Sequence, residues 1–144
     1  MGDTPADLPV PYFSADARAY WRAAKEGRLV MQKCDGCGAY RFFPSFVCSN
    51  CGSDETVWGR CSGRGTIYSL TVVHRAPSPA FRAIVPYVVA LIDLEEGPRM
   101  MANIVGDDRL DAAIGDLVEV CFEARGPEFK VPQFARVGLN DAAQ

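Results

Sequence analysis

The spacing of apolar residues near the start of the chain predicts one short helix over 14–26. Apolar side chains recur there at intervals of three and four residues, as on the buried face of a helix. Ser14 suits the N-cap position, and Gly27 suits the residue just past the helix end, where a positive φ is common. The residues of the expected buried stripe are Ala17, Tyr20, Trp21 and Ala24.

After residue 60 the pattern changes to that of short strands separated by turns rich in Gly and Pro. We expect strands over 65–74, 87–94, 100–105, 117–123 and 134–139, and a short helix over 107–114. In the first of these strands, alternation places Tyr68, Leu70 and Val72 on one face. Several short strands within about 80 residues indicate a small β-barrel.

Two matched C-x-x-C motifs lie between the expected helix and the expected barrel. Their cysteines are Cys34, Cys37, Cys48 and Cys51, with ten residues between the two motifs. Each motif forms a tight turn that aims two sulfur atoms at one point, so together they predict a tetrahedral four-sulfur metal site. Gly38 and Gly52 follow the motifs, and a positive φ there lets backbone N–H groups point at the thiolates.

The metal expected in this site is one structural zinc ion per chain. Four cysteine ligands leave no open coordination position, which argues against a catalytic ion. Iron in a rubredoxin-like site is the alternative, because geometry alone does not separate the two metals. Redox chemistry is disfavoured, since two matched motifs are hard to explain by it. Burial as a small apolar side chain fits Cys61 best, and the roles of Cys121 and His74 are left open.

The charge and hydropathy of the chain narrow its partners. The 144 residues carry a formal net charge of −3, which gives little long-range attraction for nucleic acid. There is no apolar run of about 18 residues and no basic segment followed by an apolar one, so we expect no membrane span and a cytoplasmic protein. The sequence also lacks a G-x-S-x-G motif, an open metal site and a convincing Cys–His pair. The chain alone is therefore not expected to be an enzyme.

The order of helix, four-cysteine ribbon and small barrel resembles the rubredoxin-like zinc-ribbon/OB-fold proteins, long catalogued as domain of unknown function number 35. The resemblance extends from Tyr20 to Phe134, with all four metal positions intact. It implies a mainly β fold with a short N-terminal helix, in which a rubredoxin-like zinc ribbon precedes a small OB-fold β-barrel. The expected segments are a helical segment over 12–28, the ribbon over 29–59 and the barrel over 60–139. The matching stretches are 27–34, 42–44, 62–69, 86–90 and 114–120.

The same resemblance implies a role. Members of this family are non-catalytic accessory subunits that associate with thiolase-like enzymes (acyl-CoA thiolases, aldolases or acyltransferases) and help form a CoA or acyl-CoA channel. The alternative is an OB-fold module that binds single-stranded nucleic acid, because OB barrels stack bases on aromatic side chains beside basic grooves. The acidic balance of the chain argues against this alternative. A thiolase-like gene next to this one in its genome would favour the first reading.

Any contact with the phosphates of CoA must be local and cationic, because the chain as a whole is acidic. Arg41, which lies between two aromatic residues of the ribbon, is the first candidate, together with Lys25 and Arg28 at the end of the helix. Arg75 and Arg82, which lie later in the chain, are the competing pair.

The segment over 74–86 joins two expected strands and contains three prolines. Loops of this length in a compact domain are usually functional or disordered. The apolar residues Phe81, Ile84 and Val85 are therefore candidate anchors for a partner. A stiff surface crossover without such a role is the alternative interpretation.

Overall fold

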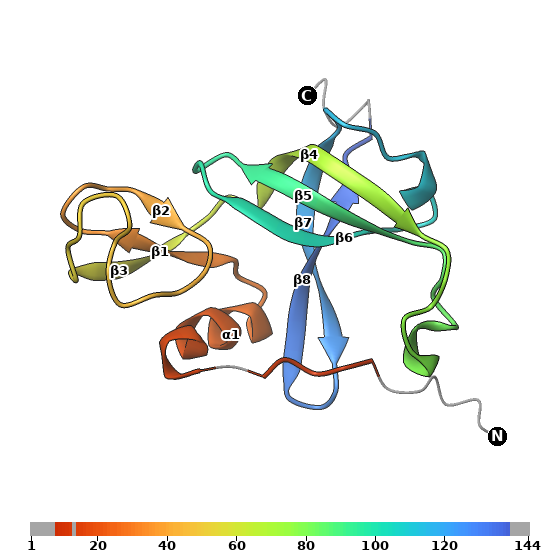
Figure 1. Cartoon of the computed structure of the whole chain (residues 1–144), viewed down its shortest axis with the longest axis horizontal. Helices are drawn as coiled ribbons and strands as arrows, with labels where there is room; N and C mark the ends of the chain where they lie inside the picture. The colour runs from red at the N-terminus through yellow and green to blue at the C-terminus, as the bar shows by residue number, and fades with distance from the viewer. Residues whose placement is uncertain (1–7, 13, 139–144) are drawn as a thin grey trace.

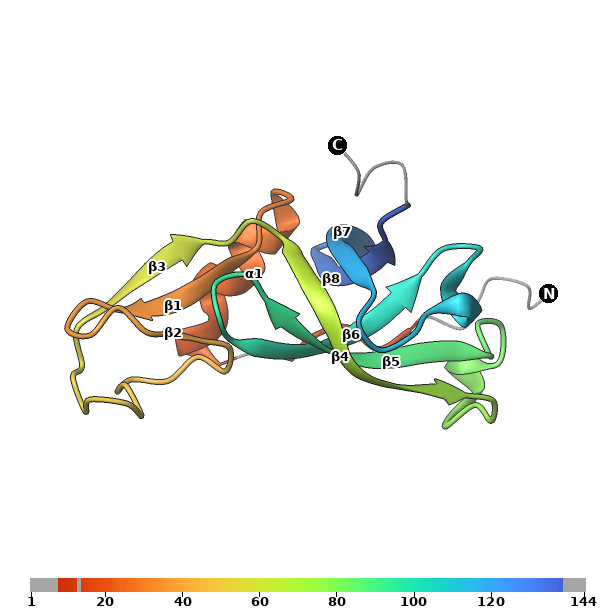
Figure 2. The ribbon, with the colours of Figure 1, turned by 90° about the horizontal axis from the view of Figure 1, so that it is seen from above.

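The computed structural model describes residues 8–12 and 14–138, and the statements below concern those residues. A small sheet and a larger barrel lie side by side along the long axis, with one helix next to both (Figure 1; Figure 2). In chain order the elements are η1 (Ala15–Ala17), α1 (Arg18–Lys25), β1 (Val30–Cys34), β2 (Tyr40–Arg41), β3 (Thr56–Arg60), β4 (Arg64–Val73), η2 (Pro79–Phe81), β5 (Tyr87–Leu94), β6 (Arg99–Val105), η3 (Arg109–Asp111), β7 (Leu117–Arg125) and β8 (Phe129–Arg136). The predicted mainly β fold is confirmed.

The helix expected near the N-terminus is also confirmed. It starts as the 3-10 turn η1 and continues as α1. Ser14 is the N-cap residue, but its hydroxyl donates to the carboxylate of Asp16 instead of accepting from a backbone N–H. Gly27 follows the helix with φ +80°, which ends it as predicted. No helix in the described ranges has the length and apolar character needed to cross a bilayer.

The apolar stripe of α1 fixes the helix against the barrel. Tyr20 and Ala24 are buried, and the ring of Trp21 meets the ring of Phe129 in β8 edge to face, with 6.0 Å between centroids. Edge-to-face aromatic pairs contribute beyond their buried area. The helix therefore packs on β8, far away in sequence, and not only on the ribbon that follows it.

The ribbon is a three-stranded antiparallel sheet in the order β2-β1-β3. Its central strand also belongs to the main core, because Leu29 and Met31 are buried in the same cluster as the barrel residues. Where the chain leaves the ribbon, the N–H of Cys61 donates to the carbonyl of Leu29 at 2.8 Å. The ribbon and the barrel thus share one continuous apolar core.

The barrel closes in the strand order β4-β5-β6-β8-β7. All neighbouring strands are antiparallel except β6 and β8, which run parallel and are joined by only two residue pairs, Ile104 with Phe134 and Val105 with Ala135. Ile104 and Phe134 are fully buried in the barrel core. The short parallel contact makes the boundary between β6 and β8 the most weakly paired part of the barrel.

The predicted face of β4 is wrong at one residue. A register shift between Ile67 and Ser69 interrupts the alternation, as a β-bulge does. Tyr68 therefore turns outward and is 50 % exposed, with the Arg99 guanidinium 3.4 Å above its ring. Leu70 and Val72 still pack against the core, as expected.

Two further expectations need correction. The helix predicted over 107–114 is wrong, because this segment contains only the 3-10 turn η3. Glycines with positive φ bound it, Gly106 at +110° and Gly115 at +96°. The final strand begins at Phe129, five residues before the predicted start at 134, and contains Pro132 in its middle. Residue 139, the predicted end, lies outside the described residues.

Candidate metal centre and adjoining groove

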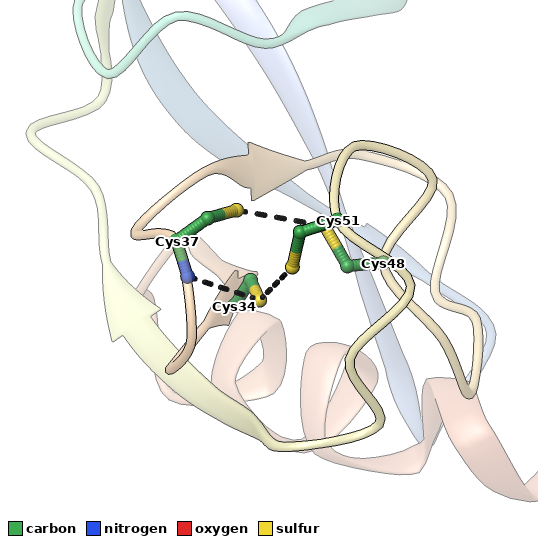
Figure 3. Close-up of side chains that lie close together, drawn as sticks. All are labelled: Cys34, Cys37, Cys48 and Cys51. Atoms are coloured by element: carbon green, nitrogen blue, oxygen red, sulfur yellow. Dashed lines mark hydrogen bonds between the residues drawn. The ribbon is translucent and has the colours of Figure 1, made fainter.

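The four predicted ligands come from two loops that face each other. Cys34 ends β1 and Cys37 lies in the following turn, whereas Cys48 and Cys51 lie in the loop before β3. Figure 3 shows the four side chains converging on one point. Their Sγ atoms all lie within 4.8 Å of one another, with 3.5 Å between Cys34 and Cys51 and 3.7 Å between Cys37 and Cys48. The predicted ligand set is confirmed as a cluster.

These separations fit a tetrahedral zinc ion and not disulfide bonds. A Zn–S bond of about 2.3 Å places the sulfur atoms of a tetrahedron about 3.8 Å apart, whereas a disulfide needs about 2.05 Å. Cys34 and Cys48 are buried, and Cys37 and Cys51 are exposed. One half of the cluster therefore faces the ribbon core and the other half faces solvent, with all four ligands supplied by the chain. This donor set is that of a structural zinc site.

Hydrogen-bond donors beside two of the sulfur atoms favour the charged form of those two. The N–H of Cys37 donates to Sγ of Cys34 at 3.4 Å, and this bond lowers the pKa of Cys34. The side-chain amide of Asn50 donates to Sγ of Cys37 at 3.4 Å and lowers the pKa of Cys37 to about 6. Metal binding requires the thiolate, so both bonds prepare the site for a cation.

The glycines after each motif have the predicted conformation. Gly38 and Gly52 both have φ +79°, and an added Cβ would meet no atom within 4 Å at either position. The N–H of Gly38 donates to the carbonyl of Cys34 and that of Gly52 to the carbonyl of Cys48, both at 2.8 Å. Glycine is used at these positions for the turn that aims each pair of sulfur atoms, and not for lack of space.

Arg41 braces the loop that follows β2. Its Nη2 donates to the carbonyl of Ser45 at 3.0 Å and to Oγ1 of Thr56 at 2.7 Å, and its Nε and Nη1 are buried without a hydrogen-bond partner among the described residues. The buried Gln32 accepts from the N–H of Ser45 at 2.8 Å. Ser45 is thus held on both sides.

The braced loop holds three apolar side chains out in solvent. Phe43 is 80 % exposed, Phe46 76 % and Val47 53 %. Large apolar side chains that are exposed next to one another are typical of an interaction surface. The strand β2 ends at Arg41, so these side chains lie in a loop and not in a strand of the ribbon.

The five predicted cations do not gather at one place. Lys25 is exposed, and Arg28 is half-buried in an ion pair with Glu26, two residues before it. Arg75 and Arg82 are exposed on the loop between β4 and β5. Whether any of these residues, or Arg41, contacts CoA stays a prediction.

A groove of about 930 Å³ lies between α1, the ribbon and the barrel. Its walls are mostly apolar and include Trp21 of α1, Phe42 of the ribbon and Met101 of β6. The loop between β4 and β5 contributes Phe81 and Ile84, two of the predicted anchors. Both are half-buried, so they form the wall of the groove and do not project from the molecule. The volume lies at the upper end of the range of small-molecule sites.

A pair of amides forms the polar part of this wall. The buried Gln133 accepts from the N–H of Asn103 at 2.7 Å through Oε1 and donates to Oδ1 of Asn103 at 3.0 Å through Nε2. Asn103 in turn donates through Nδ2 to the carbonyl of Val88 at 2.9 Å. The two amides hold each other and fix the wall between β6 and β8.

The two cations that line the groove were not predicted from the sequence. Arg109 donates to the carbonyls of Pro86 and Gly106, both at 3.2 Å. Arg125 donates to the carbonyl of Pro9 at 3.2 Å and lies 4.0 Å from the carboxylate of Glu123. Neither arginine belongs to a local motif, and each has one contact that is distant in sequence, Arg109 with Pro86 and Arg125 with Pro9.

The other residues singled out by sequence lie away from the metal cluster. Cys61 is buried, as predicted, and burial raises its pKa to about 12, with the nearby Glu96 carboxylate acting in the same direction. Cys121 is half-buried in β7, and burial raises its pKa also. His74 is exposed just after the end of β4. High thiol pKa values disfavour the reactive thiolate.

Comparison with known families agrees with this architecture. Residues 21–57 match the family model of the ChsH2 rubredoxin-like zinc ribbon domain, and residues 58–123 match that of the ChsH2 C-terminal OB-fold domain. A DUF35 domain-containing scaffold protein of Methanothermobacter thermautotrophicus is 42 % identical over 98 residues, which cover 65 % of this chain and 71 % of that protein.

Two further relatives carry the names of a hydratase subunit and an aldolase. A "Probable enoyl-CoA hydratase alpha subunit" of Thermomonospora curvata is 38 % identical over 126 residues, or 88 % of this chain, and this chain spans only 39 % of that subunit. The solved structure of an "Ltp2-ChsH2(DUF35) aldolase" contains a chain that is 37 % identical, with a TM-score of 0.80 over 88 % of this chain and 98 % of that one.

Proposed function

This chain belongs to the DUF35 family of rubredoxin-like zinc-ribbon and OB-fold proteins, and on that premise we propose that it is a non-catalytic accessory subunit of a thiolase-like enzyme. In this role it binds the enzyme subunit and completes the wall of a CoA or acyl-CoA channel. The single observation that supports this proposal most is the apolar groove, because all three parts of the fold contribute to it. A groove of this size, open to solvent, suits an acyl group enclosed between two subunits.

The composition of the groove supports a channel wall more than a catalytic site. The zinc cluster has four protein ligands and lies in the ribbon loops. None of its four cysteines lines the groove. The lining cations Arg109 and Arg125 are balanced by Asp107 and Glu123. A mostly apolar lining with no net charge is a poor match for the negatively charged backbone of nucleic acid. The groove therefore gives no support to the alternative of a single-stranded nucleic-acid module.

We expect a stable complex with the thiolase-like subunit encoded nearest to this chain in its genome. Such interfaces commonly bury at least about 1,200 Å² in total. The co-expressed pair should elute as one peak in size-exclusion chromatography at micromolar concentration. The complex should cleave acyl-CoA, and this chain alone should show no turnover. Two separate peaks would contradict the proposal.

We also propose that the phosphates of CoA contact one of the two basic groups predicted from the sequence. The exposure of Arg75 and Arg82 supports the loop pair, because their guanidinium groups are free to meet a phosphate. The buried Nε and Nη1 of Arg41 support a bracing role for that residue instead.

Titrating CoA into the complex and measuring Kd distinguishes a phosphate site on the loop from one at Arg41. Arg82→Ala should weaken binding about ten- to a hundredfold, or roughly 1.5–3 kcal/mol, because a charged hydrogen bond is lost. Arg22→Ala, which removes an exposed arginine of α1, is the matched control and should leave Kd unchanged. If Arg41→Ala weakens binding in a folded complex and Arg82→Ala does not, the phosphates lie at the ribbon.

A further inference from the structure

The barrel has an open seam between β6 and β8. The two strands share only the pairs Ile104 with Phe134 and Val105 with Ala135, although β6 begins five residues before Ile104 and β8 begins five residues before Phe134. Between these pairs and the starts of the two strands, β6 and β8 move apart, and the groove lies between them. In Figure 1 the start of β8 lies at the bottom of the view, away from β6.

The register of β6 shows which of its backbone groups face the seam. In the antiparallel pair with β5, the N–H of Leu94 donates to the carbonyl of Pro98. From there, every second residue pair of the two strands is a hydrogen-bonded pair. Met100 and Ala102 therefore direct their backbone groups to β5. The residues between them, Arg99 and Met101, direct theirs away from β5, into the seam. The N–H of Asn103 has the same direction and is taken by the side chain of Gln133.

Pro132 explains why β8 does not close the seam. Its residue pair with β7 is Phe122, and a proline has no N–H for that ladder, so the backbone of Pro132 faces the β6 side. One further step of the parallel ladder would require an N–H of residue 132 to donate to the carbonyl of Met101. Proline cannot supply it, and the ladder stops at Phe134.

The seam therefore leaves a short edge of β6 without a partner. Within the described residues, the ladder between β6 and β8 includes neither Arg99 nor Met101. Proteins usually cover or disrupt such edges, because unpaired backbone groups pair with any available strand. Met101 is 61 % exposed, so this edge is open to solvent.

We propose, resting on the accessory-subunit function above, that this edge receives one extended segment of the partner enzyme, which adds a strand to β6 at the seam. Four backbone groups, two donors and two acceptors, lie in a row on Arg99 and Met101, and a single strand of about five residues satisfies all of them. Its alternate side chains enter the groove.

The charges of the groove specify the side chains of that segment. Two cations and two anions line it, and Arg125 and Glu123 lie 4.0 Å apart. The guanidinium of Arg99 at the end of the edge already donates to both carboxylate oxygens of Asp93, at 2.6 Å and 3.2 Å. A neutral, mostly apolar wall is complementary to uncharged apolar side chains, and the flexible thioether of Met101 adapts to their shape. The segment is thus apolar and uncharged.

Residue-resolved amide hydrogen exchange tests this inference, with the co-expressed thiolase-like subunit as the partner. In the free chain, the N–H groups of Arg99 and Met101 should exchange quickly, whereas those of Met100 and Ala102 should exchange slowly because they bond to β5. In the complex, exchange at Arg99 and Met101 should slow at least tenfold, with Met100 and Ala102 as internal references.

A pair of substitutions gives a second measurement. Met101→Pro removes a seam-facing N–H without breaking a bond to β5 and should raise Kd for the partner at least tenfold. Met101→Ala keeps the N–H and should raise it much less. If Met101→Pro does not fold, the exchange experiment still decides.

Each outcome has one meaning. A complex whose Met101 amide exchanges as fast as in the free chain overturns the added strand and leaves the accessory function standing. Failure to form any complex overturns both. Slow exchange at Met101 in the free chain, together with a dimer in size-exclusion chromatography, assigns the edge to a second copy of this chain and overturns the partner segment.

Discussion

Cys48→Ser is expected to abolish zinc binding and unfold the ribbon. Cys48 is one of the two buried ligands, and its Sγ lies 3.7 Å from that of Cys37. Structural zinc sites supply roughly 10–16 kcal/mol of apparent binding free energy at neutral pH, which acts as folding free energy. The ribbon strands contain five, two and five residues, too few to form a stable sheet without the metal. Elemental analysis should show one zinc per wild-type chain and none in the variant.

The control for this experiment is Cys121→Ser. Cys121 is a half-buried cysteine of β7 outside the cluster, and its replacement should leave one zinc per chain and the amide NMR spectrum of residues 30–60 unchanged. Stoichiometric iron in freshly purified protein, or zinc retained by Cys48→Ser with an intact ribbon spectrum, would contradict the assignment of the metal and its role.

The metal cluster was predictable because its determinants are local. Each C-x-x-C turn, with the glycine after it, sets the direction of two sulfur atoms over a few residues. The structure brings the four predicted cysteines together and gives Gly38 and Gly52 the predicted positive φ. The strand β5 was predicted with its observed bounds for a similar reason, since an apolar run interrupted only by Asp93 is bounded by Pro and acidic residues. Patterns of this kind need no information from distant parts of the chain.

The groove was not predictable, because it depends on contacts between distant segments. Trp21 meets Phe129, more than a hundred residues later, and Arg125 reaches the carbonyl of Pro9. The start of β8 was missed because Pro132 normally argues against a central strand. That proline instead marks the position where β8 faces a seam.

Arg41 illustrates the same limit for a single side chain. Its position between aromatic residues next to the metal turn suggested a phosphate contact, whereas the structure gives it hydrogen bonds to Ser45 and Thr56. An arginine that holds a loop and an arginine that binds a ligand have the same local sequence. The hydrogen bond to Thr56, fifteen residues away, supports the bracing interpretation, and the phosphate contact of Arg41 stays a prediction.

Gly63→Ala is expected to destabilise the barrel by about 2–5 kcal/mol. Gly63 belongs to the Ser-Gly-x-Gly turn that enters the barrel, and two independent costs act there. Its φ of +84° is unfavourable for alanine by roughly 1–2 kcal/mol. An added Cβ would also lie 2.4 Å from Cγ1 of Val120, and overpacking of this kind costs about 1–3 kcal/mol. Val120 cannot withdraw freely, because its N–H donates to the carbonyl of Gly63 at 2.7 Å.

Gly97→Ala separates these two costs. Gly97 lies in the turn between β5 and β6 with φ +115°, and an added Cβ there would meet no atom within 4 Å. Its replacement therefore carries the conformational cost without the clash and should destabilise less than Gly63→Ala. Urea unfolding of the zinc-loaded chain, followed by tryptophan fluorescence, measures both changes. Double substitution with Val120→Ala removes the clashing methyl groups, so it should recover part of the loss at Gly63 and none at Gly97. Equal destabilisation by the two glycine variants would mean that backbone conformation alone, and not the contact with β7, accounts for glycine at the entrance to the barrel.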